Sequence, residues 1–198
     1  RRKEKYNKVN IDPATLLTPL RFDIAAKTAY AKSLLRGDRS SFAETMYLQH
    51  IKVWNNFCEQ DPPKEGQQAF LNSFCETLLS IRDSGFKKEG AIPLFNGSPL
   101  NGAHRAASCI ALNKVPIVRQ GVLAEGQVRC NYRYFRDKLD FVDGGLCETY
   151  LDEMALEYCR NKRNIFTLTL FPSHEVPIEH WLQTCRISWR FRKIFLLL

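Results

Sequence analysis

The chain has 198 residues, of which 44% are hydrophobic and 25% charged, proportions that exclude intrinsic disorder and permit one large domain or two small ones. No run of 18 or more apolar residues occurs, so we expect no membrane-spanning helix. The formal net charge of +8 indicates either a solvated basic surface or an anionic partner: a phosphorylated compound, a nucleic acid or an anionic membrane surface.

The first half of the sequence is predicted to be helical. Residues 1–11 are polar, basic and expected to be loose. Asp12 followed by Pro13 predicts the start of a short helix, with the aspartate as its cap. The same pattern, a capping residue followed by proline, recurs at Thr18-Pro19 and predicts the start of a longer helix. Gly37 is a stop signal, and either of the next two serines can cap the helix after it. The expected helices cover residues 12–17, 20–36, 41–58 and 67–84.

The second half changes character at about residue 91. A strand (91–95), a turn, a helix (103–113) and a second strand (115–121) follow one another, which is typical of an α/β unit. Residues 127–135 are interpreted as strand or extended loop. A helix over 144–160, a strand over 164–171 and a final helix from Pro177 complete the chain. We therefore predict an α/β (α+β) fold, with a helical N-terminal layer (1–90) and an α/β part (91–198) in one compact domain, itself a segment of a longer protein.

Seven cysteines are scattered through the chain without any C-x-x-C pair. This usage predicts reduced thiols in a cytoplasmic protein, with no zinc site. The final helix mixes arginines with aromatic side chains, and three interpretations remain open for it: docking onto a further domain, peripheral binding to the inner face of a membrane, or contact with nucleic acid.

The stretch "LNGAHRAA" carries the strongest chemical signal. Asn101-Gly102 predicts a turn that lets a ligand approach the backbone, and the helix after it begins with N–H groups that lack partners. His104 and Arg105 add side-chain donors, and the guanidinium of arginine suits phosphate. The interpretation is a phosphate site formed by these four residues. The alternative is that both side chains face solvent or pair with carboxylates.

The motif "NGAHRAASCIAL", flanked by "AIPLF" and "VPIV", resembles the nucleotide-binding unit of the ParB/sulfiredoxin superfamily. The resemblance covers about 30 residues and implies a small mixed sheet, with the nucleotide phosphates held by Gly102, His104 and Arg105. Ala103 stands where sulfiredoxins carry their catalytic cysteine, which counts against sulfinic acid reduction. No helix-turn-helix of the partition proteins follows the motif.

The segment "RFDIAAKTAY" allows two interpretations. Asp23 and Lys27 are spaced as a surface i,i+4 ion pair, with Arg21 toward another flank of the helix. Alternatively they form a polar edge facing the phosphate site, where Arg21 or Lys27 contacts substrate and Asp23 acts as a base or metal ligand. Glu59 is either a solvated surface carboxylate or a second candidate base at the mouth of the site. A helical segment before a Gly-x-His-Arg unit is also similar to bacterial surface-polysaccharide biosynthesis proteins.

Other polar residues carry weaker signals. We interpret His50 as a satisfied, half-buried histidine beside an apolar stripe. His174 and His180 lack a third metal ligand, and three aspartates at positions 137, 140 and 143 lack the pattern of a calcium loop. No metal-binding residue is therefore assigned.

These observations favour a transferase, of the phosphotransferase (kinase-like) or glycosyl/phosphoribosyl type. We expect it to bind ATP, CTP or an activated phosphosugar together with Mg²⁺, and to act on a small-molecule or glycan acceptor. His104 and Arg105 would assist the transfer, with Asp23 or Glu59 as base. The alternatives are a nucleotide-gated module that binds nucleic acid without transfer chemistry and a purely structural domain.

Overall fold

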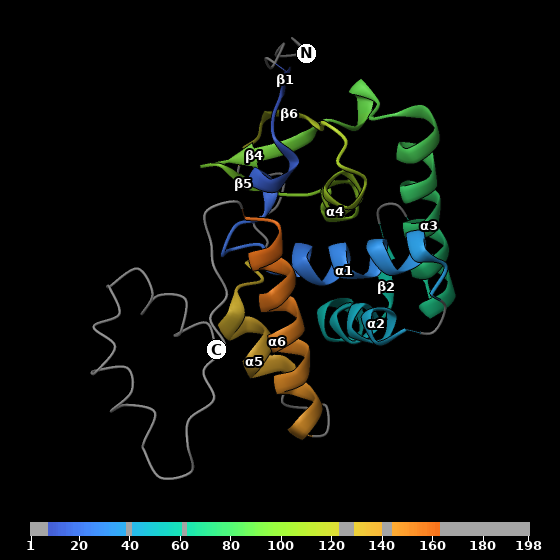
Figure 1. Ribbon diagram of the computed structural model, residues 1–198, viewed down its shortest axis with the longest axis vertical. Coiled ribbons are helices and arrows are strands. Elements are labelled where there is room, and N and C mark those ends of the chain that lie inside the picture. The colour runs from blue at the N-terminus through green and yellow to red at the C-terminus, as the bar shows by residue number, and fades with distance from the viewer. Residues whose placement is uncertain (1–7, 39–40, 61–62, 123–128, 140–143, 163–198) are drawn as a thin grey trace, which may run out of the picture.

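The computed structural model describes residues 8–38, 41–60, 63–122, 129–139 and 144–162 (Figure 1). Helices form most of this part, and a small sheet lies at one end of it. The longer elements are α1 (Asp23–Arg36), α2 (Phe42–Asn55), α3 (Gln67–Ser84), α4 (Ala103–Leu112), α5 (Tyr132–Leu139) and α6 (Gly144–Arg160). The short ones are β1 (Lys8–Asn10), η1 (Pro13–Leu16), β2 (Cys58–Gln60), β3 (Pro63–Glu65), η2 (Lys88–Gly90), β4 (Ile92–Phe95), β5 (Ser98–Pro99) and β6 (Ile117–Gln120).

The sheet is mixed, with the strand order β1-β6-β4-β5. β4 and β6 are parallel, with Ile92 opposite Val118, whereas β5 and β1 each pair antiparallel with their neighbours. A separate antiparallel hairpin joins β2 to β3. The predicted α/β class is thus confirmed at this level. The expectation that residues 1–11 are loose is wrong for Lys8–Asn10, which form the edge strand β1 beside β6.

The predicted strand, turn, helix and strand over residues 91–121 are confirmed. β4 turns at Asn96-Gly97 into β5, both turn residues having positive φ. α4 follows, and β6 returns parallel to β4. The fully buried Ala106 and Ala107 of α4 permit close approach to α1, which packs against it. This unit places the start of α4 beside the N-terminal helices.

α1 is the central helix, with α4, α2 and α6 packed around it (Figure 1). Every side chain from Asp23 to Thr28 is at most 4% exposed. A helix covered on all sides must bury its polar residues along with its apolar ones. The interpretation of Asp23 and Lys27 as a surface ion pair is therefore wrong.

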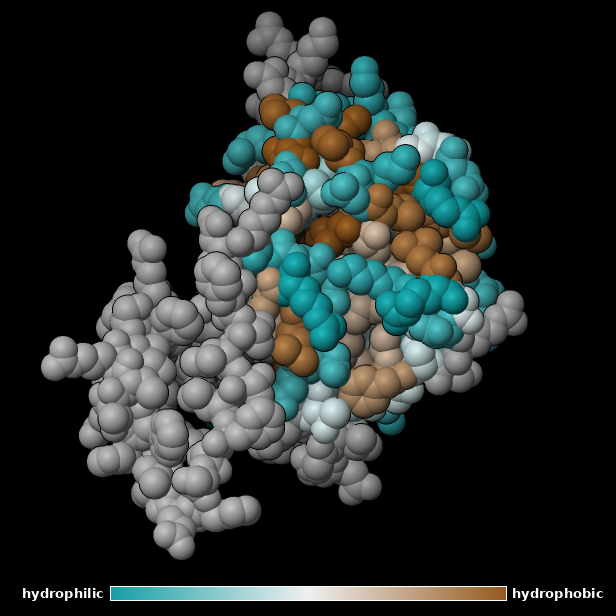
Figure 2. Space-filling view, in the orientation of Figure 1, coloured by the Kyte–Doolittle hydropathy of each residue, from teal (hydrophilic) through white to brown (hydrophobic). Residues whose placement is uncertain are grey.

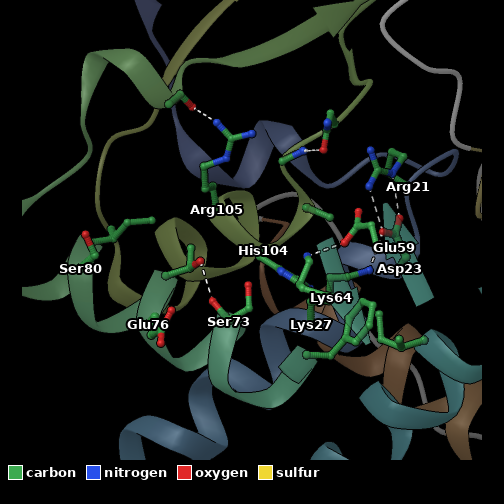
Figure 3. A pocket seen from close by; sticks show the side chains of 18 of the residues that line it. Arg21, Asp23, Lys27, Glu59, Lys64, Ser73, Glu76, Ser80, His104 and Arg105 are labelled. Carbon is green, nitrogen blue, oxygen red and sulfur yellow. Dashed lines mark hydrogen bonds and ion pairs between the residues drawn. The ribbon is translucent and has the colours of Figure 1, made fainter. Parts of the chain in front are cut away.

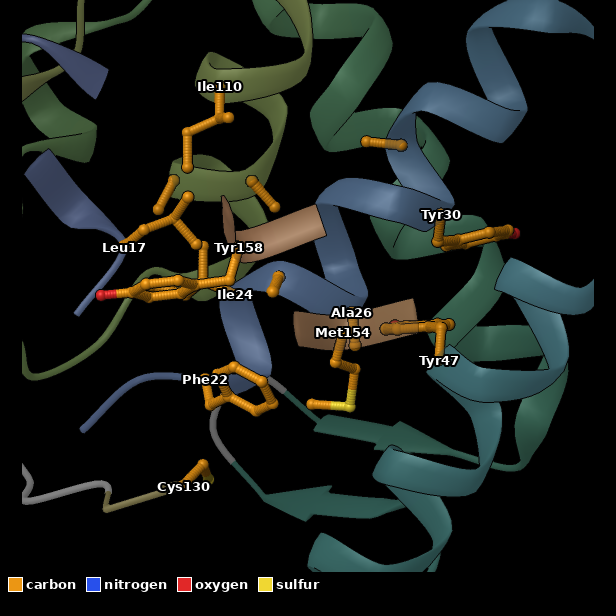
Figure 4. Packing of buried hydrophobic residues seen from close by; sticks show 14 of the residues in the cluster. Leu17, Phe22, Ile24, Ala26, Tyr30, Tyr47, Ile110, Cys130, Met154 and Tyr158 are labelled. Carbon is orange, nitrogen blue, oxygen red and sulfur yellow. The ribbon is translucent and has the colours of Figure 1, made fainter. Parts of the chain in front are cut away.

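The core joins the helices to the segment that precedes them. Figure 4 shows Phe22 and Ile24 close to Met154 and Tyr158 of α6, with Ile110 of α4 beyond them. Tyr30, Tyr47 and Phe74 form a second group of stacked rings, with centroids 4.9–5.2 Å apart. The hydrophobic core thus contains residues from both halves of the chain. On the face of the molecule shown in Figure 2, hydrophilic and hydrophobic residues are interspersed.

Local helix signals are confirmed at several positions. Asp12 caps η1 through Ala14 N, and Ser41 caps α2 by accepting from Glu44 N at 3.2 Å. Gly37 ends α1 with φ 79°. α3 covers the predicted residues, and its apolar face is buried as expected, at positions 70, 74, 78 and 81.

Other sequence signals gave wrong predictions of secondary structure. Residues 132–135 are helical, not extended, because Asn131 caps α5 by accepting from Tyr134 N at 2.9 Å. The helix predicted over 20–36 begins only at Asp23, and Leu20 lies before it with 45% of its surface exposed. The strand predicted over 164–171 and the final helix lie outside the described residues, as do His174, His180, Asp140 and Asp143. The cysteines at positions 58, 75, 109, 130 and 159 are free thiols.

Candidate functional site

A pocket of about 740 Å³ lies between α3, the start of α4 and the N-terminal end of α1 (Figure 3). Seen in this view, Arg21, Asp23 and Lys27 lie on one side of the pocket. Ser73, Glu76 and Ser80 lie on the other, along α3, with His104 and Arg105 between the two groups. The structure thus brings together the residues predicted from both halves of the chain. The pocket is also lined by His50, Trp54, Asn55, Glu59, Lys64, Thr77, Gly90, Asn101 and Gly102.

The first turn of α4 forms one wall of the pocket. Gly102 occupies the N-cap position with φ 81°, and no side chain caps the helix. Asn101 instead accepts a hydrogen bond from Gly102 N at 2.5 Å. The N–H groups of the first turn have no partners within a helix and carry its positive partial charge. This wall is therefore suited to bind an anion.

Arg105 folds back over this turn instead of extending into the pocket. Its Nη1 donates to the carbonyl of Gly90, in η2 (Figure 3). A Cβ added at Gly102 would lie 2.9 Å from Nη2 and 3.2 Å from Cζ. Burial, and then the charge of Arg119, lowers the pKa of Arg105. The guanidinium thus ties η2 to α4, and Gly102 provides both the backbone conformation and the space that this contact needs.

His104 lies against aromatic rings. Its ring centroid is 4.7 Å from Phe74 and 5.7 Å from Tyr47, both in edge contact, and its Nε2 is 3.2 Å from the Tyr47 hydroxyl. Burial, with the charges of Lys27 and Lys64, holds the pKa of His104 well below its ordinary value. His104 is therefore neutral at pH 7 and contributes a polar imidazole, not a second cation.

A buried cluster of charged side chains forms the wall beside α4. Arg21 donates from Nε and Nη2 to the two carboxylate oxygens of Asp23, at 2.8 and 2.9 Å, and from Nη1 to Pro99 O at 2.6 Å. Lys27 Nζ lies 2.9 Å from Asp23 Oδ2 and 2.7 Å from His50 Nε2. Arg21 precedes α1, so the expectation that it lies on another flank of that helix is wrong.

The protonation states in this cluster follow from its contacts. Burial alone would raise the pKa of Asp23, but the charges of Arg21 and Lys27 hold it well below its usual range. Burial and the neighbouring Lys27 lower the pKa of His50 strongly. Since an ammonium can only donate, Nε2 of His50 accepts from Lys27, and the proton of the neutral ring is on Nδ1.

The cluster therefore holds two cations, one carboxylate and one neutral imidazole. His50 Nδ1 is buried and has no partner among the described residues. His50 is thus more deeply buried than the sequence suggested, at 3% exposure, and is not fully satisfied. Its contact with Lys27 was not predicted, because the two residues lie on different helices.

Glu59 lines the pocket at its mouth. It stands opposite Lys64 in the β2–β3 hairpin, and the two side chains form an ion pair. The Glu59 side chain remains 39% exposed. It is therefore accessible to a ligand, in contrast to Asp23, whose oxygens already accept three hydrogen bonds from two cations.

The sequence interpretation did not single out Lys64 or the polar residues of α3. Ser73, Glu76, Thr77 and Ser80 recur at i, i+3, i+4 and i+7, beside the apolar positions of the same helix. This helical periodicity was visible in the sequence, but nothing in it indicated that the polar face borders a cavity.

No group of three or more His, Cys, Asp or Glu side chains with metal-binding geometry occurs among the described residues. Asp137 lies exposed on α5. Within the same residues, no helix is both long and apolar enough to cross a membrane.

Comparison with protein-family models, curated proteins and solved structures finds no match to this chain. The likeness of "NGAHRAASCIAL" to the ParB/sulfiredoxin superfamily therefore stays a prediction.

Proposed function

We propose that the chain is a transferase that binds a phosphorylated donor in this pocket, with the donor's phosphates between the first turn of α4 and the side chains of Arg21 and Lys27. The observation that carries the proposal is a buried cluster with one more cation than carboxylate, beside an uncapped helix N-terminus.

The charge balance of the cluster favours an anionic ligand. Arg21 and Lys27 are 2% and 4% exposed, and Asp23 neutralises only one of them. A buried charge without a counter-charge costs several kcal/mol, so the remaining positive charge is best satisfied by an anion in the adjoining pocket. The partial positive charge at the N-terminus of α4 acts in the same direction.

The proposed roles follow from what each side chain contacts. Asp23 holds Arg21 and Lys27 in place, since its carboxylate accepts hydrogen bonds from both. A carboxylate with so low a proton affinity is a poor base, and we assign that role to Glu59, which is exposed at the mouth. Lys27 stabilises the charge that develops on the transferred or leaving phosphate.

The motif residues complete the site. Gly102 and Asn101 present the N–H groups of α4, and Arg105 fixes the turn against Gly90. His104 provides a neutral imidazole for the leaving oxygen.

ATP, CTP or an activated phosphosugar would be the donor, and a small molecule or glycan the acceptor. Mg²⁺ is usually held largely by substrate phosphates, so it would enter this pocket bound to the donor and leave Glu59 free to act as the base.

A thermal-shift and transfer assay tests the proposal. Nucleoside triphosphates, nucleoside diphosphate sugars and sugar phosphates are screened with Mg²⁺ against the wild type, Lys27→Gln and the control Lys114→Gln. Lys114 is exposed beyond the far end of α4. We expect one class of compound to raise the melting temperature of the wild type and of Lys114→Gln, but not of Lys27→Gln.

Mass spectrometry of acceptor mixtures then detects the transferred group. Equal stabilisation of all three proteins would refute the phosphate site. Stabilisation without any product would refute the transfer step and favour a nucleotide-binding module instead.

A further inference from the structure

The α3 wall of the pocket carries polar side chains that the proposed phosphate site does not use. Ser73, Glu76, Thr77 and Ser80 line the cavity from successive turns of one helix face. From Ser73 to Ser80 the helix rises about 10 Å, at 1.5 Å per residue, which is longer than one sugar ring. The face lies across the pocket from Arg21 and Asp23 (Figure 3).

Most of these side chains have no hydrogen-bond or ion-pair partner within the part of the chain that the structure describes, and Glu76 and Ser80 are exposed to solvent. On the rest of the helix, Gln68 donates to Asn72 at 2.8 Å and Arg82 pairs with Asp83 at 2.7 Å. Among the described residues, by contrast, the Glu76 carboxylate and the Ser73 and Ser80 hydroxyls have no hydrogen bond or ion pair. Thr77 donates to Ser73 O at 2.8 Å and keeps its oxygen lone pairs.

The sign of the charge indicates which ligand group this wall accepts. The Glu76 carboxylate accepts hydrogen bonds, and the residues three and four positions away on α3 include no cation. It repels phosphate, which the opposite side of the pocket attracts. A neutral group with several hydroxyl donors satisfies Glu76 and can exchange hydrogen bonds with the two serines.

A second set of polar atoms borders the same cavity. Asn55, at the end of α2, has a buried Oδ1 without a partner among the described residues. The adjacent Trp54 lines the pocket with 45% of its surface exposed. Aromatic faces and amide groups are both suited to bind the apolar and polar sides of a sugar ring.

We propose that the α3 wall is a subsite for a vicinal diol of a sugar ring, with the Glu76 carboxylate accepting from both hydroxyls and Ser73 and Ser80 flanking it. The inference rests on the proposed function, because it takes the phosphates to occupy the opposite side of the pocket. It adds that the ligand bound there is a polyhydroxylated compound, present either as the ribose of a nucleotide or as a sugar acceptor.

Calorimetric titration tests the subsite with three probes: pyrophosphate, ribose 5-phosphate and 2-deoxyribose 5-phosphate. We expect ribose 5-phosphate to bind the wild type about tenfold more tightly than its 2-deoxy analogue, as for one hydrogen bond to a charged group. Glu76→Gln should abolish this difference and leave pyrophosphate binding unchanged. The matched control is Glu65→Gln, which alters an exposed residue of β3 outside the pocket and should behave as the wild type.

Two further titrations distinguish the sources of the diol. Weaker binding of a 2′,3′-dideoxynucleoside triphosphate than of the ordinary nucleotide assigns the subsite to ribose. Binding of a free hexose to the pyrophosphate-saturated protein, lost in Glu76→Gln, assigns it to an acceptor. Pyrophosphate binding with no discrimination between diol and deoxy probes overturns this inference alone, whereas a wild type that binds no phosphorylated probe overturns the proposed function itself.

Discussion

Replacing Asp23 with Asn should destabilise the protein strongly, because the carboxylate holds two buried cations. Arg21 and Lys27 together donate three hydrogen bonds to it, at 2.8–2.9 Å, and all three side chains are at most 5% exposed. Removing one partner of a buried ion pair leaves an uncompensated charge and costs about 3–5 kcal/mol. We therefore expect Asp23→Asn to lower the free energy of unfolding by that amount.

The same change should make stability depend on anions. In the variant, Arg21 and Lys27 face the pocket without a counter-charge, so bound phosphate should restore part of the loss. Urea denaturation at increasing phosphate concentration measures both effects. The control is Asp38→Asn, whose ion pair with Arg36 is exposed and should contribute less than about 1 kcal/mol. A loss in Asp23→Asn no larger than in this control, or no greater response to phosphate than in the wild type, would refute the reasoning.

Three further predictions concern the turn, a cap and the histidines. Gly102→Ala should lower the free energy of unfolding by about 1–2 kcal/mol in urea denaturation, because φ is 81° there; an unchanged value would contradict this. Asn131→Ala should cost about 1 kcal/mol through loss of the α5 cap, whereas Asn131→Asp should not. His50 and His104 have strongly lowered pKa values, so the unfolded chain binds more protons below about pH 6.5. Stability should therefore fall as pH drops below that value, less steeply in His104→Gln, and an identical slope would show that His104 does not contribute.

Helix positions were predictable where short-range signals act. The apolar spacing of α3, the glycine after α1 and the serine cap of α2 each reflect contacts within a few residues, and each is confirmed. The start of α5 was predicted to be extended because aromatic and basic residues alternate over 132–134, which favours a strand. Asn131, which caps α5, is a residue type that favours helix starts, and it could have predicted this helix.

The buried charged cluster could not be predicted from short-range sequence patterns, because its residues are brought together by contacts between distant parts of the chain. Asp23 and Lys27 have the spacing of a surface pair, and only the packing of α2, α4 and α6 around α1 buries them. Arg21 belongs to the buried cluster because the chain before α1 is not helical. Extending the helical spacing of α1 back to Arg21 therefore predicted the wrong orientation for its side chain. His50 comes from another helix, 23 residues beyond Lys27.

Two residues that can carry a positive charge, His104 and Arg105, stand at the start of α4, where the helix dipole disfavours cations. The structure accounts for them differently from the motif alone. His104 is neutral among aromatic rings, and Arg105 turns back to a backbone carbonyl, so neither places a free positive charge in front of the helix. The buried positive charge beside the pocket comes instead from Arg21 and Lys27, in the N-terminal part of the chain. Ligand binding at the motif should therefore depend more on these residues than on His104, and the N-terminal helices are an integral part of the site.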